Sequence, residues 1–388
     1  MRRIRVLNVI GSVGRGGTER LMYDLLSRLD GEIFDLEVWS VGMPRTEAEL
    51  RRFEAAGIRT DVMTVDGSRW SELFGHAYRT IKQRRFDVVH THHWAANNWM
   101  RAAAILAGVP VVMTYEHGFT RETWRRHLLW MVLNLRTYRN VVVSEAVKNT
   151  QYRGRLGCTP KVSIITNGVD LGRFTFTTDQ ETLMAKERLC LLARQPVVGV
   201  VGRFVPCKRH GLFVEACSFV LKKTPEAQFV IAGEGLEEQN LRSLLNRIGL
   251  ESKVRLLGWR SDIEEVYKAM DVFVMTSDEM EGFGLASVEA MACGKPVVAV
   301  DVPVNAEVIT TECGILVAPD PESLAQGVGH LLENPGLARR MGVLGRKRAE
   351  ERFDIARAAA MLSSLYEEAV KSKGIKLNRE VDTCQRYT

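Results

Sequence analysis

The chain has 388 residues, of which 46% are hydrophobic and 26% charged, a composition typical of a soluble globular enzyme. This length predicts two domains in place of a single core, and seven scattered cysteines without a Cys-x-x-Cys pair argue against a disulfide framework or a zinc ribbon. Residues 1–165 hold 25 Lys and Arg against 16 Asp and Glu, a net +9, whereas the remainder holds 28 against 31, a net −3. We therefore expect the N-terminal half to face an anionic partner: a phosphorylated acceptor, a lipid-linked diphosphate or a membrane surface.

Apolar, β-rich runs alternate with amphipathic stretches in the first part of the chain, beginning with a strand at Ile4–Ile10 and a helix at Thr18–Leu29. The first of these runs is too short for a signal peptide, and no run reaches the length of a transmembrane helix. Further buried strands are predicted at residues 34–40, 60–65, 87–91, 109–114, 140–143 and 162–165. This alternation is typical of a parallel sheet with helices on both faces.

Two motifs in this part raise the question of a cofactor. The glycine-rich loop from Gly11 to Gly17 departs from the Gly-x-Gly-x-x-Gly spacing, and no acidic residue follows where a dinucleotide site needs one, so an NAD site is not predicted. In His90-Thr-His-His93, two of the imidazoles share one face of a strand and His93 points away. Because no carboxylate cluster accompanies them, we predict no metal site; the strand end favours a role on the acceptor side.

Residues 121–139 combine Trp124, Trp130 and several arginines with leucines. Basic residues with interfacial aromatics can seat a helix on a membrane surface. A packed helix with snorkelling arginines fits the same residues equally well, so both interpretations stay open.

A turn at Asn167-Gly-Val-Asp170 and a polar stretch at 175–181 interrupt the pattern. A second series of strands is then predicted at residues 197–201, 228–232, 254–257, 271–275, 296–300 and 314–317. The resulting architecture has a first domain at 1–170, a second at 171–354, a last helix at 355–372 that packs back on the first domain, and a polar tail at 373–388. Both domains are predicted to be doubly wound α/β sheets.

The segment Glu281-Gly-Phe-Gly-Leu-Ala-Ser-Val-Glu289 places two carboxylates on either side of a helix start. At about 1.5 Å per helical residue they lie about 12 Å apart or less, roughly the length of a ribose–diphosphate–hexose unit. Unpaired amides and the positive end of the helix dipole suit phosphate at such a helix start. One segment can therefore hold sugar hydroxyls, diphosphate and ribose hydroxyls, although two glutamates at this spacing also occur by chance.

Four motifs in this order resemble the retaining glycosyltransferases of family 4, also called glycosyl transferases group 1. They are the Glu281–Glu289 segment, Gly-Arg-Phe-Val-Pro-Cys-Lys at 202–208, Ile-Ala-Gly-Glu-Gly at 231–235 and Asn167–Asp170. The resemblance extends from Ile4 to about Glu368. It implies the GT-B fold, two Rossmann-like domains facing across a cleft, with the nucleotide-sugar donor bound by the C-terminal domain and the acceptor by the N-terminal one. It also implies retention of anomeric configuration and no essential metal or other cofactor.

The resemblance assigns roles to particular residues. Arg203 and Lys208 would neutralise the departing diphosphate, Glu281 would contact hydroxyls of the transferred sugar, and His117 would lie near the reaction centre. Glu289 would accept hydrogen bonds from the ribose hydroxyls. The remaining donor-binding candidates line the loops around these residues, with the base expected near Arg260: Gly16, Gly17, Gly202, Gly233, Gly235, Arg260, Gly282, Phe283, Gly284 and Leu285.

The expected function is thus a metal-independent hexosyltransferase that uses a nucleoside diphosphate sugar, UDP being favoured over GDP. The expected acceptor is a hydroxyl of a surface polysaccharide, lipopolysaccharide or glycolipid precursor, and nucleic acid is not expected as a partner. We expect a cytoplasmic protein, with peripheral attachment to the inner face of the plasma membrane left open. A nucleotide-sugar epimerase of the same fold and a non-catalytic nucleotide-sugar-binding protein remain the alternatives.

Overall fold

The computed structural model describes residues 2–11, 17–41, 47–63, 70–93, 96–119, 124–152 and 161–375. Within them the chain divides into two compact units. The first unit comprises Met1–Val142, Tyr152–Ile165 and Ala359–Thr388; the second comprises Val143–Gln151 and Thr166–Ala358. The longer segment of the second unit therefore begins after residue 165, whereas the sequence predicted that the second domain begins after residue 170.

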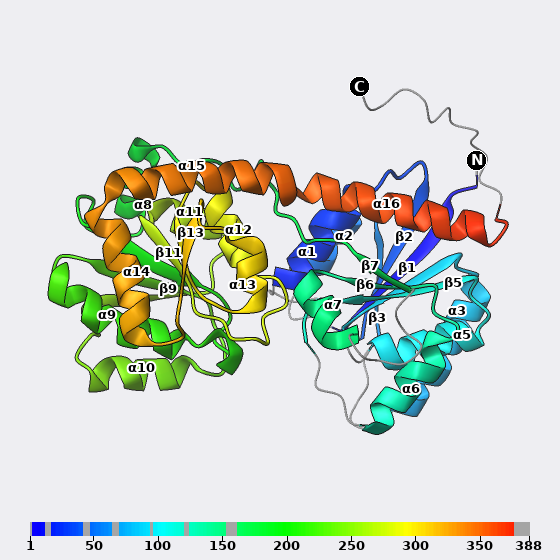
Figure 1. Ribbon diagram of the computed structural model, residues 1–388. Coiled ribbons are helices and arrows are strands. Elements are labelled where there is room, and N and C mark those ends of the chain that lie inside the picture. Colours follow the sequence, from blue (N-terminus) through cyan, green and yellow to red (C-terminus); the bar gives the residue numbers. More distant parts are fainter. Residues whose placement is uncertain are drawn as a thin grey trace. The chain divides into compact units, whose positions relative to one another are not determined.

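A seven-stranded parallel sheet forms the centre of the first unit, in the order β3-β2-β1-β4-β5-β6-β7 (Figure 1). Its strands are β1 (Ile4–Ile10), β2 (Phe34–Ser40), β3 (Arg59–Val62), β4 (Val88–His92), β5 (Val111–Glu116), β6 (Arg139–Val142) and β7 (Val162–Ile164). The connecting helices are α1 (Gly17–Leu26), α2 (Glu47–Ala55), α3 (Trp70–Arg84), the π-helix η1 (Ala96–Met100), α5 (Arg101–Leu106) and α6 (Trp124–Asn134). The predicted parallel sheet is confirmed, although β3 ends at Val62 and not at residue 65.

The central strands β1, β4 and β5 each contain an apolar run and are buried on both faces, the pattern of a parallel sheet covered by helices. One core lies between the sheet and the layer of α3, η1 and α5, where Leu7, Val89 and Ile81 are fully buried. Polar side chains nevertheless occupy the middle of three neighbouring strands: Asn8, His90, His92 and Thr114 are all fully buried. Buried polar groups need hydrogen-bond partners, so these residues mark a site of special interest.

The second unit contains a six-stranded parallel sheet in the order β10-β9-β8-β11-β12-β13. Its strands are β8 (Val197–Val201), β9 (Gln228–Ala232), β10 (Val254–Gly258), β11 (Val272–Met275), β12 (Val297–Val300) and β13 (Gly314–Val317). Its helices are α7 (Glu145–Tyr152), α8 (Asp179–Arg188), the 3₁₀ helix η3 (Pro206–Lys208), α9 (His210–Lys223), α10 (Glu238–Arg247), α11 (Ile263–Ala269), α12 (Leu285–Ala292), α13 (Pro303–Val308), α14 (Pro321–Glu333) and α15 (Pro335–Arg352). In Figure 1, α9, α10 and α14 cover one face of this sheet, and α11, α12 and α15 cover the other.

Two segments reach their unit from elsewhere in the chain. All but the last residue of α7 belongs to the second unit, where Glu307 of α13 accepts hydrogen bonds from the amides of Glu145 and Ala146. The last helix, α16 (Ile355–Ser372), enters the first unit at Ala359. There Tyr366, fully buried, hydrogen-bonds Asn8 of β1 and His90 of β4.

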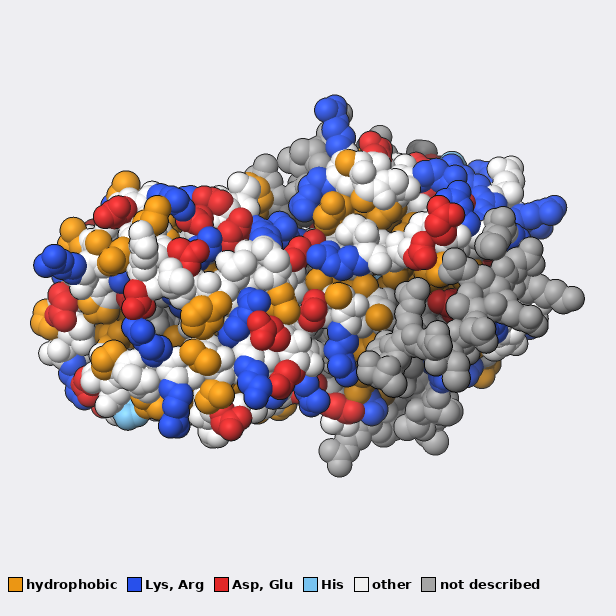
Figure 2. Space-filling view, turned by 90° about the horizontal axis from the view of Figure 1, so that it is seen from above, with side chains coloured by type: hydrophobic (Ala, Val, Ile, Leu, Met, Phe, Trp, Pro, Cys, Tyr) orange, Lys and Arg blue, Asp and Glu red, His pale blue; other side chains and the backbone are white. Residues whose placement is uncertain are grey.

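Charge is unevenly distributed over the surface. Seen from above in Figure 2, acidic and basic side chains intermingle over the second unit, and Lys and Arg gather at one end of the first unit, at the upper right.

Candidate active site

An ion pair between Lys208 and Glu281 lies at the carboxyl end of the second sheet. Lys208 ends the short helix η3, just after β8, and Glu281 lies in the loop between β11 and α12. Thr276, directly after β11, donates to the carbonyl oxygen of Lys208 over 2.7 Å and so ties the two loops together. Because ligands of open α/β sheets bind beyond the carboxyl ends of the strands, this position suits a substrate site.

The Glu281 carboxylate is held in its charged form. Burial by itself raises its pKa, but the Lys208 ammonium and hydrogen bonds from Ser277 and Gly284 outweigh burial and keep the pKa below its usual value. The Gly284 amide donates to Oε1 over 3.3 Å. An ionised carboxylate is an acceptor only, so Glu281 can receive hydrogen bonds from sugar hydroxyls.

The start of α12 offers backbone amides beside this ion pair. Gly284 precedes the helix with a positive φ of 81°, a conformation that glycine adopts without strain. The amides of Leu285 and Ala286, in the first turn, donate to no other described residue. The preceding loop is fixed by Ser144, whose hydroxyl donates to the carbonyl oxygen of Gly282 over 3.0 Å. Free amides at a helix start form a site for phosphate.

Glu289, about one turn into α12, is half buried and accepts a 2.6 Å hydrogen bond from the hydroxyl of Tyr267 on α11. Burial, followed by the Glu289 carboxylate, raises the pKa of Tyr267 well above its usual value, so the phenol keeps its proton and remains a donor. The bond to Tyr267 therefore orients the Glu289 carboxylate.

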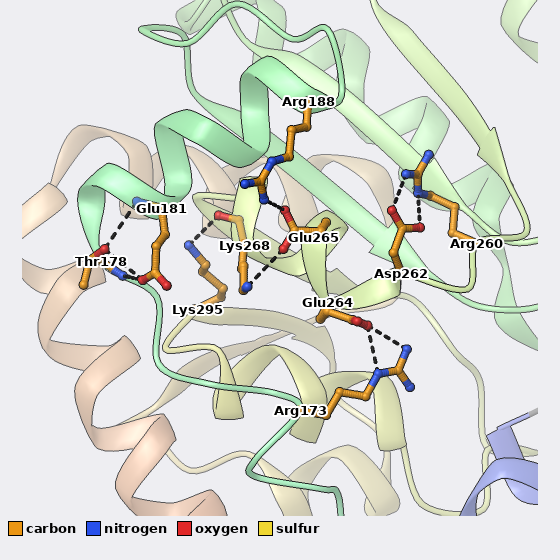
Figure 3. A network of polar contacts seen from close by, with 10 residues as sticks. All are labelled: Arg173, Thr178, Glu181, Arg188, Arg260, Asp262, Glu264, Glu265, Lys268 and Lys295. Atoms are coloured by element: carbon orange, nitrogen blue, oxygen red, sulfur yellow. Dashed lines mark hydrogen bonds and ion pairs between the residues drawn. The ribbon is translucent and has the colours of Figure 1, made fainter.

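The two arginines predicted for this site differ in their surroundings. Arg203, after β8, is exposed, and its side chain forms no hydrogen bond or ion pair with another described residue, although its charge acts on the nearby Cys207 thiol. Arg260 is committed to a bidentate pair with Asp262, at 2.6 and 3.0 Å (Figure 3). Arg203 is thus available to an anion, whereas Arg260 must first leave its carboxylate partner.

Two predicted glycines, Gly233 and Gly235, allow two loops to pack closely at the sheet edge. A Cβ on Gly233 would overlap the carbonyl oxygen of Gly202, and one on Gly235 would overlap that of Phe204. The Phe204 amide donates to Glu234 over 2.8 Å across the same contact. Close backbone approach explains these glycines, and it brings the loop that carries Arg203 and Lys208 against the end of β9.

The other predicted residues fall in several places. Phe283 is buried and packs edge-on against Phe353, 5.7 Å between ring centroids, so it can offer a ligand only its backbone. Leu285 is the first residue of α12 and half buried. Gly17 begins α1 in the first unit, and Gly16 lies outside the described residues.

His117 follows β5 in the first unit. Its Nε2 lies 3.1 Å from Nδ1 of His92, at the end of β4, and its ring stacks on Tyr115 at 4.4 Å between centroids. Burial, and then the neighbouring His93 and His90, lower the pKa of His117 well below its usual value. His117 is therefore neutral at physiological pH and can accept or donate one hydrogen bond at each ring nitrogen.

The histidine run of β4 lies in the same group. His90 and His92 are buried side by side, 4.7 Å between ring centroids, and the His93 ring lies 5.1 Å from that of His117.

Across the described ranges, no three His, Cys, Asp or Glu side chains are arranged to hold a metal ion. The five cysteines that the structure describes are free thiols. No helix in these ranges is long and apolar enough to cross a membrane.

Sequence reasoning missed four residues that support the site: Tyr267, Ser144, Asn8 and Tyr366. Each contacts a site group or its neighbour from a distant part of the chain, as when Ser144 reaches Gly282. Only Asn8 left a signal, because an amide in the middle of an otherwise apolar strand requires a partner.

Comparison with known proteins gives two family matches. The model of the family "Glycosyl transferases group 1" matches residues 186–348, and that of "Glycosyltransferase Family 4" matches residues 15–173. A D-inositol 3-phosphate glycosyltransferase of Salinispora tropica is 30% identical over 339 residues, which span 78% of this chain and 67% of that enzyme.

Two further proteins extend the comparison. The UDP-Gal:alpha-D-GlcNAc-diphosphoundecaprenol alpha-1,3-galactosyltransferase of Escherichia coli is 34% identical over 230 residues, which span 56% of this chain but only 59% of that enzyme. The crystal structure of Anabaena HepE in complex with UDP-glucose superposes with a TM-score of 0.81 at 23% identity, covering 95% of this chain and all of that one.

Proposed function

Because the chain belongs to the glycosyltransferases of group 1 and family 4, we propose that it is a retaining hexosyltransferase that takes its sugar from a nucleoside diphosphate. One observation carries this proposal: Lys208, Glu281 and the free amides of α12 lie together at the carboxyl end of the second sheet. Cation, carboxylate and amides are the groups that a nucleotide sugar requires.

In the proposed reaction the bond between the anomeric carbon and the diphosphate breaks, and the acceptor oxygen bonds to the same face of that carbon. The acceptor proton passes to the departing phosphate. Negative charge grows on the diphosphate, where Lys208, Arg203 and the α12 amides stabilise it. These groups supply the positive charge, so we propose that no divalent metal is needed; turnover should be unchanged by a chelator.

The ion pair stabilises the two charged side chains of the site when no nucleotide sugar is bound. Lys208 and Glu281 neutralise each other in the structure, which lowers the cost of their partial burial. A bound donor offers the ammonium its diphosphate and offers the carboxylate its sugar hydroxyls. Both partners then exchange one interaction for another, and neither charge is left uncompensated.

We propose a UDP-hexose as donor and a hydroxyl of a lipid-linked or polysaccharide precursor as acceptor. The name of the Escherichia coli relative supports both, and the UDP-glucose in the Anabaena structure supports the donor. His117, neutral and at the end of β5, is proposed to hydrogen-bond the transferring sugar. Glu289, oriented by Tyr267, is proposed to bind the ribose.

The test is transfer of labelled sugar from a panel of UDP-hexoses to lipid-linked and polysaccharide acceptors. Arg203→Ala and Lys208→Ala should each lower turnover by about 10²-fold or more, because each removes charge stabilisation of the leaving group. Arg203→Ala should leave the unfolding midpoint nearly unchanged, since Arg203 is exposed, whereas Lys208→Ala also lowers stability because it leaves Glu281 without its cation. Lys222→Ala, an exposed lysine at the end of α9, serves as control. Near-wild-type turnover in both site variants would refute the proposal. A new sugar nucleotide formed from donor alone would instead indicate an epimerase.

An apolar stripe on α6 supports a further proposal, that the enzyme docks on an anionic membrane. Trp124, Leu128, Val132 and Leu135 recur every three or four residues and are 69%, 48%, 63% and 77% exposed. Arg136, exposed, adjoins the stripe. A bilayer accepts such a helix face, and the net +9 of residues 1–165 complements anionic lipid. We propose on this basis that the enzyme works at the cytoplasmic face of the plasma membrane.

Flotation with vesicles tests this docking. The protein should float with vesicles containing anionic phospholipid and much less with neutral ones, and Val132→Ser with Leu135→Ser should abolish flotation because it removes apolar area from the stripe. Leu192→Ser, which changes an equally exposed leucine of the second unit, should float like wild type. Equal flotation of the double variant and wild type would show that another surface binds lipid.

A further inference from the structure

A chain of hydrogen bonds links His117 to the last helix through the interior of the first unit. His117 Nε2 lies 3.1 Å from His92 Nδ1, and His92 Nε2 lies 3.2 Å from the side-chain oxygen of Asn8. The Tyr366 hydroxyl donates to the same oxygen over 3.2 Å and lies 2.7 Å from His90 Nδ1. Asn8, His90, His92 and Tyr366 are all fully buried. The chain therefore runs through a place where water cannot replace a missing partner.

The protons along this chain follow from the orientation of the Asn8 amide, whose oxygen faces His92 in the structure. The Asn8 oxygen can only accept, so the His92 nitrogen facing it, Nε2, must carry a hydrogen. Burial holds the pKa of His92 well below its usual value, so the ring is neutral and has one N–H only. Its Nδ1 is then bare and accepts, and the donor opposite it must be Nε2–H of His117.

This assignment leaves Nδ1 of His117 without a hydrogen. A neutral imidazole with its hydrogen on Nε2 has a bare Nδ1, and this nitrogen is buried without a hydrogen-bond partner in the protein. An unpaired buried acceptor is costly unless something else supplies the hydrogen. Nδ1 of His117 is thus an acceptor that no protein group occupies, whereas its Nε2–H donates to His92.

We propose that His92 is a positioning residue that holds His117 in the Nε2–H tautomer, through a hydrogen-bond chain anchored by Asn8 and Tyr366. His117 can then accept a hydrogen bond from a substrate hydroxyl through Nδ1 and cannot donate one there. This role of His92 rests on the proposed function of His117 in sugar transfer, although the tautomer itself does not depend on it.

The opposite orientation of the Asn8 amide would give the opposite tautomer of His117. An Asn8 amide turned the other way would donate to His92, reverse every bond between Asn8 and His117, and place the hydrogen on His117 Nδ1. The two arrangements predict opposite tautomers for one ring. The tautomer of His117 in the intact, ligand-free protein is therefore the measurable signature.

The experiment is ¹H–¹⁵N correlation through two bonds on protein labelled at histidine, with His117→Gln to assign the ring. Wild type should show the Nε2–H tautomer. His92→Phe, which keeps an aromatic ring but removes the acceptor, should lose this tautomer preference, and transfer should fall about tenfold or more. His92→Asn places an amide oxygen close to the position of Nδ1, so it should restore the tautomer and most of the activity.

The outcomes separate the two claims. An Nδ1–H tautomer in wild type, or an unchanged tautomer in His92→Phe, would overturn the role of His92. Tyr366→Phe provides a second check, since it keeps the ring but removes the anchoring hydroxyl, and it should weaken the preference in the same direction. Failure of the proposed function is a different result: His117→Gln would then transfer sugar as fast as wild type, whatever the tautomer.

Discussion

Lys295, directly before β12, is a lysine in the interior of the second unit, only 6% exposed. Its ammonium donates to the Lys268 carbonyl oxygen over 2.9 Å (Figure 3). It also donates to the Thr182 hydroxyl over 3.1 Å. These bonds join α8, α11 and β12 at the edge of the sheet opposite the Lys208 site. Burial lowers the pKa of Lys295 from its ordinary 10.5 to about 8, and the more distant Asp271 offsets only part of that effect.

This shift predicts a pH dependence of stability. In the folded chain Lys295 loses its proton near pH 8, whereas in the unfolded chain it keeps it until about pH 10.4. Between these values the unfolded state binds the extra proton, so the free energy of unfolding rises with pH, by at most about 1.4 kcal/mol per pH unit. The free energy of unfolding in urea should therefore rise more with pH for wild type than for Lys295→Met, so that the difference between them grows from pH 8 to pH 10.

Lys253→Met is the control for this measurement, because Lys253 also donates to a carbonyl oxygen but is exposed. Its difference from wild type should stay flat over the same pH range. A flat difference for Lys295→Met as well would show that the buried ammonium titrates alike in both states.

The chemistry of single residues could be predicted where a motif places them together. Lys208 and Glu281 belong to two segments that follow neighbouring strands of a parallel sheet, so topology alone brings their loops to one edge. Tyr267 could not be predicted in the same way, since its hydroxyl reaches Glu289 from a helix whose other buried residues are apolar. Its partner is set by the packing of α11 on α12, which no local pattern encodes.

In α15, packing against neighbouring residues decides whether a glycine contributes to stability. It lies against α12, and Arg346 fixes the contact by donating to the carbonyl oxygen of Ala292, the last residue of α12, over 2.8 Å. Gly342, one turn earlier, is buried against the backbone of Gly294. The missing side chain is what permits the two helices to approach.

We predict opposite effects for two Gly→Ala substitutions in this one helix. Alanine ordinarily favours a helix over glycine by about 0.5–1 kcal/mol. At Gly342 the new Cβ would overlap the Gly294 carbonyl oxygen, so Gly342→Ala should destabilise by about 1–3 kcal/mol. At Gly336 nothing lies within 4 Å, so Gly336→Ala should stabilise by a few tenths of a kcal/mol to about 1. Thermal unfolding distinguishes them; a stabilising Gly342→Ala would mean that α15 shifts freely.

The elements themselves follow closely from sequence. The strands predicted at 4–10, 34–40, 197–201, 228–232 and 314–317 have the bounds expected, because strands buried on both faces read as unbroken apolar runs. The assignment of α7 to the second unit does not follow, since its polar sequence has no apolar stripe that identifies its neighbour. Its place depends on Glu307, which caps the helix from 161 residues away.

At the scale of the whole molecule, the chain passes between the two units four times. The first unit is closed only when residues from Ala359 on return to it. In this returning segment Leu362, Tyr366, Ala369 and Val370 are fully buried. Tyr366 also satisfies Asn8 and His90, polar groups that would otherwise be buried without that partner. The first unit is thus a product of both ends of the chain.

A fragment of residues 1–170 should therefore fail to fold, although it contains all seven strands of the first sheet. Without α16 it would expose the apolar surface that the returning helix covers and would leave His90 Nδ1 without the Tyr366 hydroxyl, at a cost of about 1–3 kcal/mol for the unpaired group. Native domains have only about 5–15 kcal/mol of stability to lose. We expect a weak near-ultraviolet circular dichroism signal and strong binding of a hydrophobic dye.

Joining residues 355–375 to that fragment through a flexible linker should restore the native signal, because it supplies the missing helix without the second unit. The same joined fragment with Tyr366→Ala and Leu362→Ala should remain unfolded, since it restores the chain length but not the buried contacts. If residues 1–170 alone gave a cooperative unfolding transition, α16 would be an accessory to the first unit. The hydrogen-bond chain from Tyr366 to His117 would then lack the fixed anchor on which the tautomer depends.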